Sequence, residues 1–202
     1  MIKWILGSLV AGCLAGYINN NFLSAFPNGL ISDQLFTVAL IALLFVFGFS
    51  FALDKDAVDK MRKTGVRILA FPLLVVLGSL VGGLVAGLVL QLNLTGTMAV
   101  SSGFGWYTLA GPMMGQLLGP KWGTLGFTAN FLRELITITS IPLMVKLDKF
   151  APVASGGGTT MDTTLGVIMR YCGKDTLILA FSNGLVLSLV APFAMIGLAS
   201  LT

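Results

Sequence analysis

Long hydrophobic runs alternate with short polar connections along most of the chain. A helix needs about 20 predominantly apolar residues to cross a bilayer, and five runs approach or exceed that length. These runs predict five transmembrane helices, over residues 2–18, 35–53, 68–92, 122–145 and 176–201. The predicted fold class is therefore all-α, a polytopic helical membrane protein that forms a single transmembrane domain over residues 1–202.

Two further segments, 95–120 and 151–172, are mostly apolar but are interrupted by glycine, proline, serine and threonine. Each is either a re-entrant loop or a broken spanning helix. Basic residues gather on the cytoplasmic side of membrane proteins, and the re-entrant reading leaves fewer of them outside, by one charge. Non-helical backbone at membrane depth is tolerated only inside protein or beside a water-filled cavity. We therefore expect these segments to line a polar pocket.

The two interrupted segments and the spans after them resemble each other, which indicates an internal repeat of units 95–147 and 151–201. SGFGWYTLAGPMM aligns with GTTMDTTLGVIM, and LGFT of the following span aligns with LAFS at a slightly smaller offset. In the same alignment Asn130 falls near Asn183. If the interrupted segments are re-entrant, the two units have opposite orientations, which is the inverted-repeat plan of secondary transporters.

Composition and charge support the membrane reading. The chain is 56% hydrophobic and only 10% charged, against about 25% charged residues in soluble domains. Five of the twelve basic residues fall between residues 55 and 67, which predicts a cytoplasmic loop, a cytoplasmic N-terminus and, after five spans, a C-terminus outside. The net charge of +4 reflects this clustering and does not predict a nucleic-acid partner. Histidine is absent, which excludes imidazole catalysis and histidine-ligated metals, and no cofactor is predicted.

Two acidic residues lie inside apolar or small-residue segments, Glu134 in 122–145 and Asp162 in 151–172. A charge at the bilayer centre costs at least about 2.5–3.5 kcal/mol on insertion scales, so such residues usually face a cavity, a partner or a permeant. Arg133 precedes Glu134, but adjacent helix residues do not face each other. Asn130, one turn earlier, shares the Glu134 face. Asp162 is also a candidate helix N-cap, for a helix starting at about residue 163.

Other small and polar residues of the interrupted segments are candidates to line a substrate pocket. Glycines let the backbone unwind, and free N–H groups at the start of a half-helix attract an anion such as an amino-acid carboxylate. The glycines spaced four apart at 111, 115, 119 and 123 are better explained by close helix packing. The remaining candidates for substrate binding are Ser102, Trp106, Tyr107, Thr108, Gly158, Thr159 and Thr160.

Three sequence blocks resemble those of the LysO-type lysine exporters: AVSSGFGWYT at 99–108, NFLREL at 130–135 and GGTTMDTTL at 157–165. They occur in the family's order, and the acids have the family's spacing. The resemblance implies a non-enzymatic transporter that exports L-lysine, and analogues such as thialysine, across the inner membrane. Glu134 and Asp162 match the two acids that the family needs. Proton antiport is the natural energy source, and sodium coupling is the alternative.

The chain departs from the family pattern in two ways. Phe131 stands where the family has aspartate, and Gly166 where it has proline, which leaves the substrate open. The family's usual chain also has a further N-terminal part. We therefore expect a small membrane subunit to complete the transporter, with a homodimer as the second possibility.

The residue types suggest a mechanism. Two carboxylates suit the α- and ε-ammonium groups of lysine, and half-helix N–H groups and Arg133 suit its carboxylate. Binding would then exchange with protons by alternating access. The alternatives are a sodium-coupled transporter or cation channel for another small solute, and a partner subunit that does not itself transport.

Overall fold

The computed structural model describes residues 67–202 and twelve scattered positions between residues 11 and 53. The chain divides into two compact units, 1–53 and 54–202. In the first unit the described positions are helical, and the rings of Phe45 and Phe49, one helical turn apart, stack with centroids 6.1 Å apart. Most of the predicted spans 2–18 and 35–53, and the basic residues before Arg67, lie outside the described residues.

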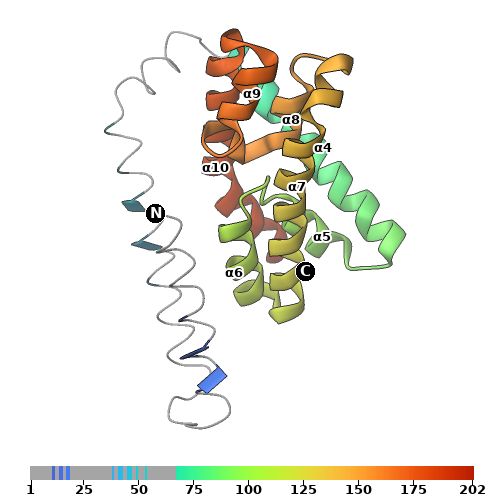
Figure 1. Cartoon of the computed structure of the whole chain (residues 1–202). Helices are drawn as coiled ribbons and strands as arrows, with labels where there is room; N and C mark the ends of the chain where they lie inside the picture. Colours follow the sequence, from blue (N-terminus) through green and yellow to red (C-terminus); the bar gives the residue numbers. More distant parts are fainter. Residues whose placement is uncertain are drawn as a thin grey trace. The chain divides into compact units, whose positions relative to one another are not determined.

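The second unit is built from helices alone over its described residues, which agrees with the all-α prediction (Figure 1). The long helices are α4 (Arg67–Leu90), α7 (Pro120–Leu147) and α10 (Leu177–Ala199). The shorter elements are α5 (Leu94–Ser101), α6 (Tyr107–Leu118), α8 (Ala151–Gly156), the 3-10 helix η2 (Gly157–Met161), α9 (Leu165–Cys172) and the 3-10 helix η3 (Lys174–Thr176).

Within the described part of the chain, two stretches are long and apolar enough to cross a membrane: 69–90 and 174–199. They coincide with the predicted spans 68–92 and 176–201. Helix α7 is 28 residues long, but it carries Lys121, Arg133, Glu134 and Lys146, which lower its mean hydropathy. The total of five spans therefore stays a prediction.

Helices α5 and α6 form a hairpin that folds back along the first half of α7. Gly96, near the start of α5, approaches the Trp122 ring, and Gly115, near the end of α6, lies against Gly123. A Cβ atom on Gly123 would come within 2.9 Å of the Gly115 Cα. The absence of side chains at these two positions therefore permits the close contact between α6 and α7, as the glycine spacing indicated.

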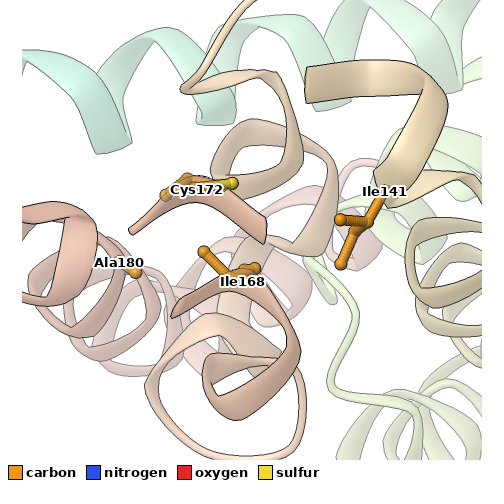
Figure 2. Close-up of a cluster of buried hydrophobic side chains, with 5 residues drawn as sticks. Ile141, Ile168, Cys172 and Ala180 are labelled. Carbon is orange, nitrogen blue, oxygen red and sulfur yellow. The ribbon is translucent and has the colours of Figure 1, made fainter. Parts of the chain in front are cut away.

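The second interrupted segment folds back along the other half of α7. Its core combines α7, α8, α9 and α10 through buried side chains, of which Figure 2 labels Ile141, Ile168, Cys172 and Ala180. Val153 of α8 completes this cluster. In Figure 1, α6 lies beside one end of α7, and α8 lies nearer the other. The breaks between the half-helices consequently come together near the middle of α7.

Candidate functional site

The two helix breaks touch each other through their backbones. The Gly158 amide of η2 donates a hydrogen bond to the Phe104 carbonyl oxygen, with an N···O distance of 2.7 Å. Phe104 and Gly157 both have positive φ angles, +49° and +63°. At Gly157 a side chain would collide with the Phe104 carbonyl oxygen, so glycine is needed there both for its φ angle and for the contact.

Asn130 of α7 holds the first break in place. Its Oδ1 accepts a hydrogen bond of 2.7 Å from the Gly105 amide, and its Nδ2 donates to the carbonyl oxygens of Val100 at 2.9 Å and Gly126 at 2.8 Å. The side chain is buried. This residue, predicted as a site residue, thus satisfies backbone groups that the interruption between α5 and α6 leaves without helical partners.

Asn183 of α10 has a similar position at the second break. Its Nδ2 contacts the carbonyl oxygens of Val153 at 3.3 Å and Gly157 at 3.1 Å, and the Thr160 Oγ1 at 3.3 Å. Asn130 and Asn183 each bind a valine carbonyl that lies 30 residues earlier in the chain. The sequence alignment paired the two asparagines, but Asn183 was not among the predicted site residues.

Arg133 fixes the end of α8. Its Nε donates to the Ser155 carbonyl oxygen at 2.8 Å, its Nη2 to that of Ala154 at 3.1 Å, and its Nη1 to the Ser79 Oγ of α4 at 2.9 Å. A cation is favourable at the C-terminal end of a helix, where carbonyl groups lack partners. Across the described residues, only Lys149 and Asp175 form an ion pair within 4 Å. Arg133 therefore donates hydrogen bonds to the backbone carbonyl groups at this helix end, and it forms no ion pair with a described acid.

Glu134 points away from Arg133 and interacts with Tyr107. The Glu134 residue is 8% exposed, and its carboxylate forms a side-chain hydrogen bond with the Tyr107 hydroxyl. Tyr107 is also close enough to Asp162 to interact with it electrostatically. The Tyr107 phenol at the start of α6 therefore interacts with both acids that the sequence singled out, Glu134 on α7 and Asp162 in the second break.

Tyr107 also belongs to an aromatic cluster. The Tyr107 ring is nearly perpendicular to the rings of Phe127 and Phe131, with both centroid distances at 5.5 Å, and the two phenylalanine rings stack 5.9 Å apart. Phe127 and Phe131 are 45% and 40% exposed. They lie two turns and one turn before Glu134 on α7, so the rings and the carboxylate share one helix face.

Asp162 lies between η2 and α9 and is exposed. Its Oδ1 accepts a 2.6 Å hydrogen bond from the Thr163 amide. Helix α9 begins at Leu165 after Thr164, which makes no side-chain capping bond. The N-cap position is thus a threonine rather than Asp162, and the capping alternative for Asp162 does not apply. The 3-10 turn and the residues after it lengthen this break, so the helix starts later and the carboxylate stays accessible.

The hydroxyls predicted to line the pocket are mostly used inside the breaks. Ser102 donates to the Ala99 carbonyl at 2.7 Å and Thr159 to that of Gly156 at 2.9 Å. The Thr160 Oγ1 lies 2.7 Å from the carbonyl oxygens of both Gly157 and Ala180, either of which can accept its one hydrogen. These residues are buried, whereas Trp106 is half-buried and Thr108 exposed. The accessible polar groups are therefore those around Tyr107, Thr108 and Asp162.

A separate cavity of about 250 Å³ lies between α4, α5 and α7. Most of its lining is apolar or small, and its polar groups include Thr97, Ser101, Asn130 and Arg133. Neither Glu134 nor Asp162 lines it. Across the described parts of the chain, no three histidine, cysteine or acidic side chains are grouped as metal ligands would be.

Comparison with known proteins identifies the family. The family model of the lysine exporter LysO matches residues 6–199. The chain is 35% identical over 153 residues to the lysine exporter LysO of Escherichia coli K12, covering 76% of this chain and 51% of that protein. It is 28% identical over 194 residues to a putative lysine exporter of Haemophilus influenzae, covering 95% of both chains.

The chain therefore spans about half the length of the Escherichia coli relative but nearly all of the Haemophilus influenzae one. No solved structure matches it. The interrupted helices, the acid at the centre of α7 and the acid in the second break all fall within the matched region. The chain belongs to the LysO lysine exporter family.

Proposed function

We propose that this chain exports L-lysine across the inner membrane and that Glu134 and Asp162 bind the substrate. The observation that carries the proposal is the position of Tyr107, which is hydrogen-bonded to Glu134 and within electrostatic reach of Asp162. Both acids therefore act electrostatically on the same phenol. Ionisable groups at membrane depth mark substrate or ion pathways by default, and the relatives are named as lysine exporters.

The chemistry of this group suits a doubly cationic amino acid. Two carboxylates match the two ammonium groups of lysine, and thialysine has the same charges. The exposed faces of Phe127 and Phe131 add cation–π attraction of about 0.5–2 kcal/mol for an ammonium group placed over them. Phe131 stands where the family pattern has an aspartate. In this chain that position therefore offers the ammonium group a cation–π contact in place of a third carboxylate.

We further propose that backbone amides bind the substrate carboxylate, in place of the Arg133 guanidinium group that the sequence suggests. Each guanidinium nitrogen of Arg133 donates one hydrogen bond, to Ser79, Ala154 or Ser155, and these bonds hold the guanidinium group against the end of α8. We therefore assign Arg133 a positioning role. Amide groups at the accessible second break, beside Asp162, are the remaining candidates for the carboxylate.

Transport then proceeds by alternating access, with protons as the coupling ion. Protonation of Glu134 and Asp162 competes with binding of the two ammonium groups, so lysine and protons exchange on the same carboxylates. Sodium is the alternative ion, and loss of efflux when sodium is replaced by choline would identify it.

The topology that accompanies this mechanism has two re-entrant hairpins, α5–α6 and α8–α9, which enter the membrane from opposite sides. Units 95–147 and 151–201 are then inverted repeats, as in other secondary transporters with broken helices. The recurrence of the asparagine contacts at equivalent positions of the two units supports this arrangement. The N-terminus is cytoplasmic and the C-terminus lies outside.

Partners follow from the site. Phe127 and Phe131 are exposed among the described residues, which fits a covering element on this face. We propose a small membrane subunit for this role, with a second copy of the chain as the alternative.

The experiment is lysine efflux from cells that lack their own lysine exporter. One strain carries this chain alone, and the other also carries a candidate small membrane subunit from the same genome. Efflux from the first strain would establish a self-sufficient transporter. Efflux from the second strain alone would establish a two-part transporter, and no lysine efflux from either would overturn lysine as the substrate.

A further inference from the structure

Asn130 and Asn183 share one contact at equivalent positions and differ in another. Both Nδ2 groups donate to carbonyl oxygens of the half-helix before the break, at Val100 and Val153. Phe104 and Gly157, which follow those two valines at the same distance along the chain, both have positive φ angles. The two breaks therefore share one backbone design, with each asparagine holding its own break.

The two asparagines differ in whether the side-chain oxygen Oδ1 accepts a hydrogen bond. Asn130 Oδ1 accepts from the Gly105 amide, directly after Phe104, at 2.7 Å. The equivalent donor for Asn183 is the Gly158 amide, directly after Gly157, but this group donates to the Phe104 carbonyl at 2.7 Å. Among the buried side-chain polar atoms of the described residues, Asn183 Oδ1 is the one left without a partner. Asn183 itself is 0% exposed.

A buried acceptor without a partner is rare and unfavourable, so its retention calls for an explanation. The Gly158 amide is a nearby donor that could bond to Asn183 Oδ1. Asn183 Nδ2 already contacts the Gly157 carbonyl at 3.1 Å, and the Gly158 amide belongs to the same peptide group as that carbonyl. A local rotation of the 157–158 peptide, at a glycine pair, is enough to change the partner of this amide.

We propose that Asn183 is a positioning residue whose Oδ1 is the acceptor for the Gly158 amide in a second, oppositely facing state of the transporter. In that state the first break takes the role that the second has here. The Gly105 amide leaves Asn130 Oδ1 and donates to the Gly157 carbonyl, while the Gly158 amide leaves Phe104 and donates to Asn183.

The exchange conserves the bond between the two breaks and the number of paired asparagine oxygens, while Asn183 Nδ2 and Thr160 Oγ1 give up the Gly157 carbonyl and keep their contacts with Val153 and Ala180. Each state has one asparagine oxygen paired, one unpaired, and one backbone bond between the breaks. Two packings of this kind differ little in free energy, as alternating access requires, and inverted repeats supply them by exchanging conformations. The proposal rests on the transport function above, since it concerns the conformational change that carries the bound substrate across.

The test measures which side of the membrane reaches the site. A reporter cysteine at the exposed Thr163, in a background with Cys13 and Cys172 replaced by alanine, is labelled in membrane vesicles with an impermeant maleimide. Labelling rates from the two faces give the ratio of the two states. Asn183→Leu removes the acceptor of the second state, so this ratio shifts toward the described state by roughly tenfold, about the effect of one buried hydrogen bond.

The matched variant Asn130→Leu removes the acceptor of the described state, so the ratio shifts in the opposite direction. Ser182→Ala, at the buried neighbour of Asn183 in α10, leaves the ratio unchanged. Shifts of the labelling ratio in the same direction for both asparagine variants, or no shift in either, would overturn the proposal. A merely structural role of the asparagines does not predict that the two variants shift the ratio in opposite directions.

Asn183→Asp keeps an acceptor oxygen at the same position, and it is the variant to use if Asn183→Leu does not fold. It retains labelling from both faces, and labelling from only the face that the described state exposes would also overturn the proposal. Labelling requires no lysine. A failure of the exchange is therefore distinguishable from a failure of lysine as the substrate, which the efflux assay reports separately.

Discussion

The Arg133 Nε donates a hydrogen bond of 2.8 Å to the carbonyl oxygen of Ser155, which is 22 residues later in the chain. This contact joins the centre of α7 to the end of the half-helix α8. It places a positive charge where the helix leaves carbonyl groups without partners. The adjacent Glu134 is therefore free to interact with Tyr107 on another face of the same helix.

Replacing Arg133 by lysine should destabilise the protein, because one ammonium group cannot reproduce three donors in the planar geometry of a guanidinium group. Each buried hydrogen bond that is lost costs about 1–3 kcal/mol when its partner stays buried. Thermal unfolding in detergent should show a clearly lower midpoint for Arg133→Lys. Lys146→Arg, which alters an exposed cation of the same helix, should leave the midpoint unchanged, and equal midpoints for both variants would contradict the assigned contacts.

Two glycines of α10 should respond in opposite ways to alanine. A Cβ atom on Gly184 would come within 2.8 Å of the Gly158 carbonyl oxygen, whereas one on Gly197 meets nothing within 4 Å. Gly184→Ala should therefore push α10 from the second break and cost about 1–3 kcal/mol. Gly197→Ala should be neutral or stabilising by up to about 1 kcal/mol, because alanine favours the helix. The unfolding midpoints measure both, and a tolerated Gly184→Ala would argue against the close packing of η2.

Removing the Tyr107 hydroxyl should weaken substrate binding without removing the ring. Tyr107→Phe loses the hydrogen bond to Glu134, so the carboxylate is less well oriented, and we expect the KM for lysine to rise roughly tenfold, about the effect of one hydrogen bond. Initial rates of lysine transport at varied concentrations give this value. An unchanged KM would mean that Tyr107 does not orient Glu134 for binding.

The cation–π contribution of Phe131 is separable from its apolar character. Phe131→Leu remains apolar but has no π face, and its KM for lysine should rise roughly threefold to tenfold, in line with about 0.5–1.5 kcal/mol. Phe131→Tyr retains the ring and should transport with a nearly unchanged KM. Equal KM values for the two variants would indicate that the side chain only contacts lipid or a neighbouring subunit.

The regular parts of this fold were predictable from sequence, whereas the contacts between the breaks were not. Uncharged runs located α4 and α10, and glycine spacing indicated the close contact between α6 and α7. The carbonyl groups that Arg133 binds could not be found in this way, because they are backbone atoms of a segment distant in the chain and any residue type supplies them. From sequence, the hydroxyls of Ser102, Thr159 and Thr160 are candidates to line a pocket. Their hydrogen bonds to nearby carbonyl oxygens depend on the local fold, which the sequence does not reveal.

The proposed repeat of units 95–147 and 151–201 was indicated by the sequence only in part. The alignment paired Asn130 with Asn183, but it set the two interrupted segments slightly further apart than the equivalent contacts at the breaks. The second break is longer because it includes the 3-10 turn η2 and the residues up to Thr164. The two asparagines, which hold similar backbone groups, therefore align more closely with the structure than the loop residues between the half-helices do.

The most direct test of the central claim is lysine efflux by the variants Glu134→Gln and Asp162→Asn, in whichever of the two strains described above exports lysine. The control is Asp175→Asn, which removes a highly exposed carboxylate whose only described ion pair is with Lys149 at 3.6 Å. The account predicts background efflux from the first two variants, at normal amounts of folded protein in the membrane, and normal efflux from the control. Normal efflux from both Glu134→Gln and Asp162→Asn would contradict it.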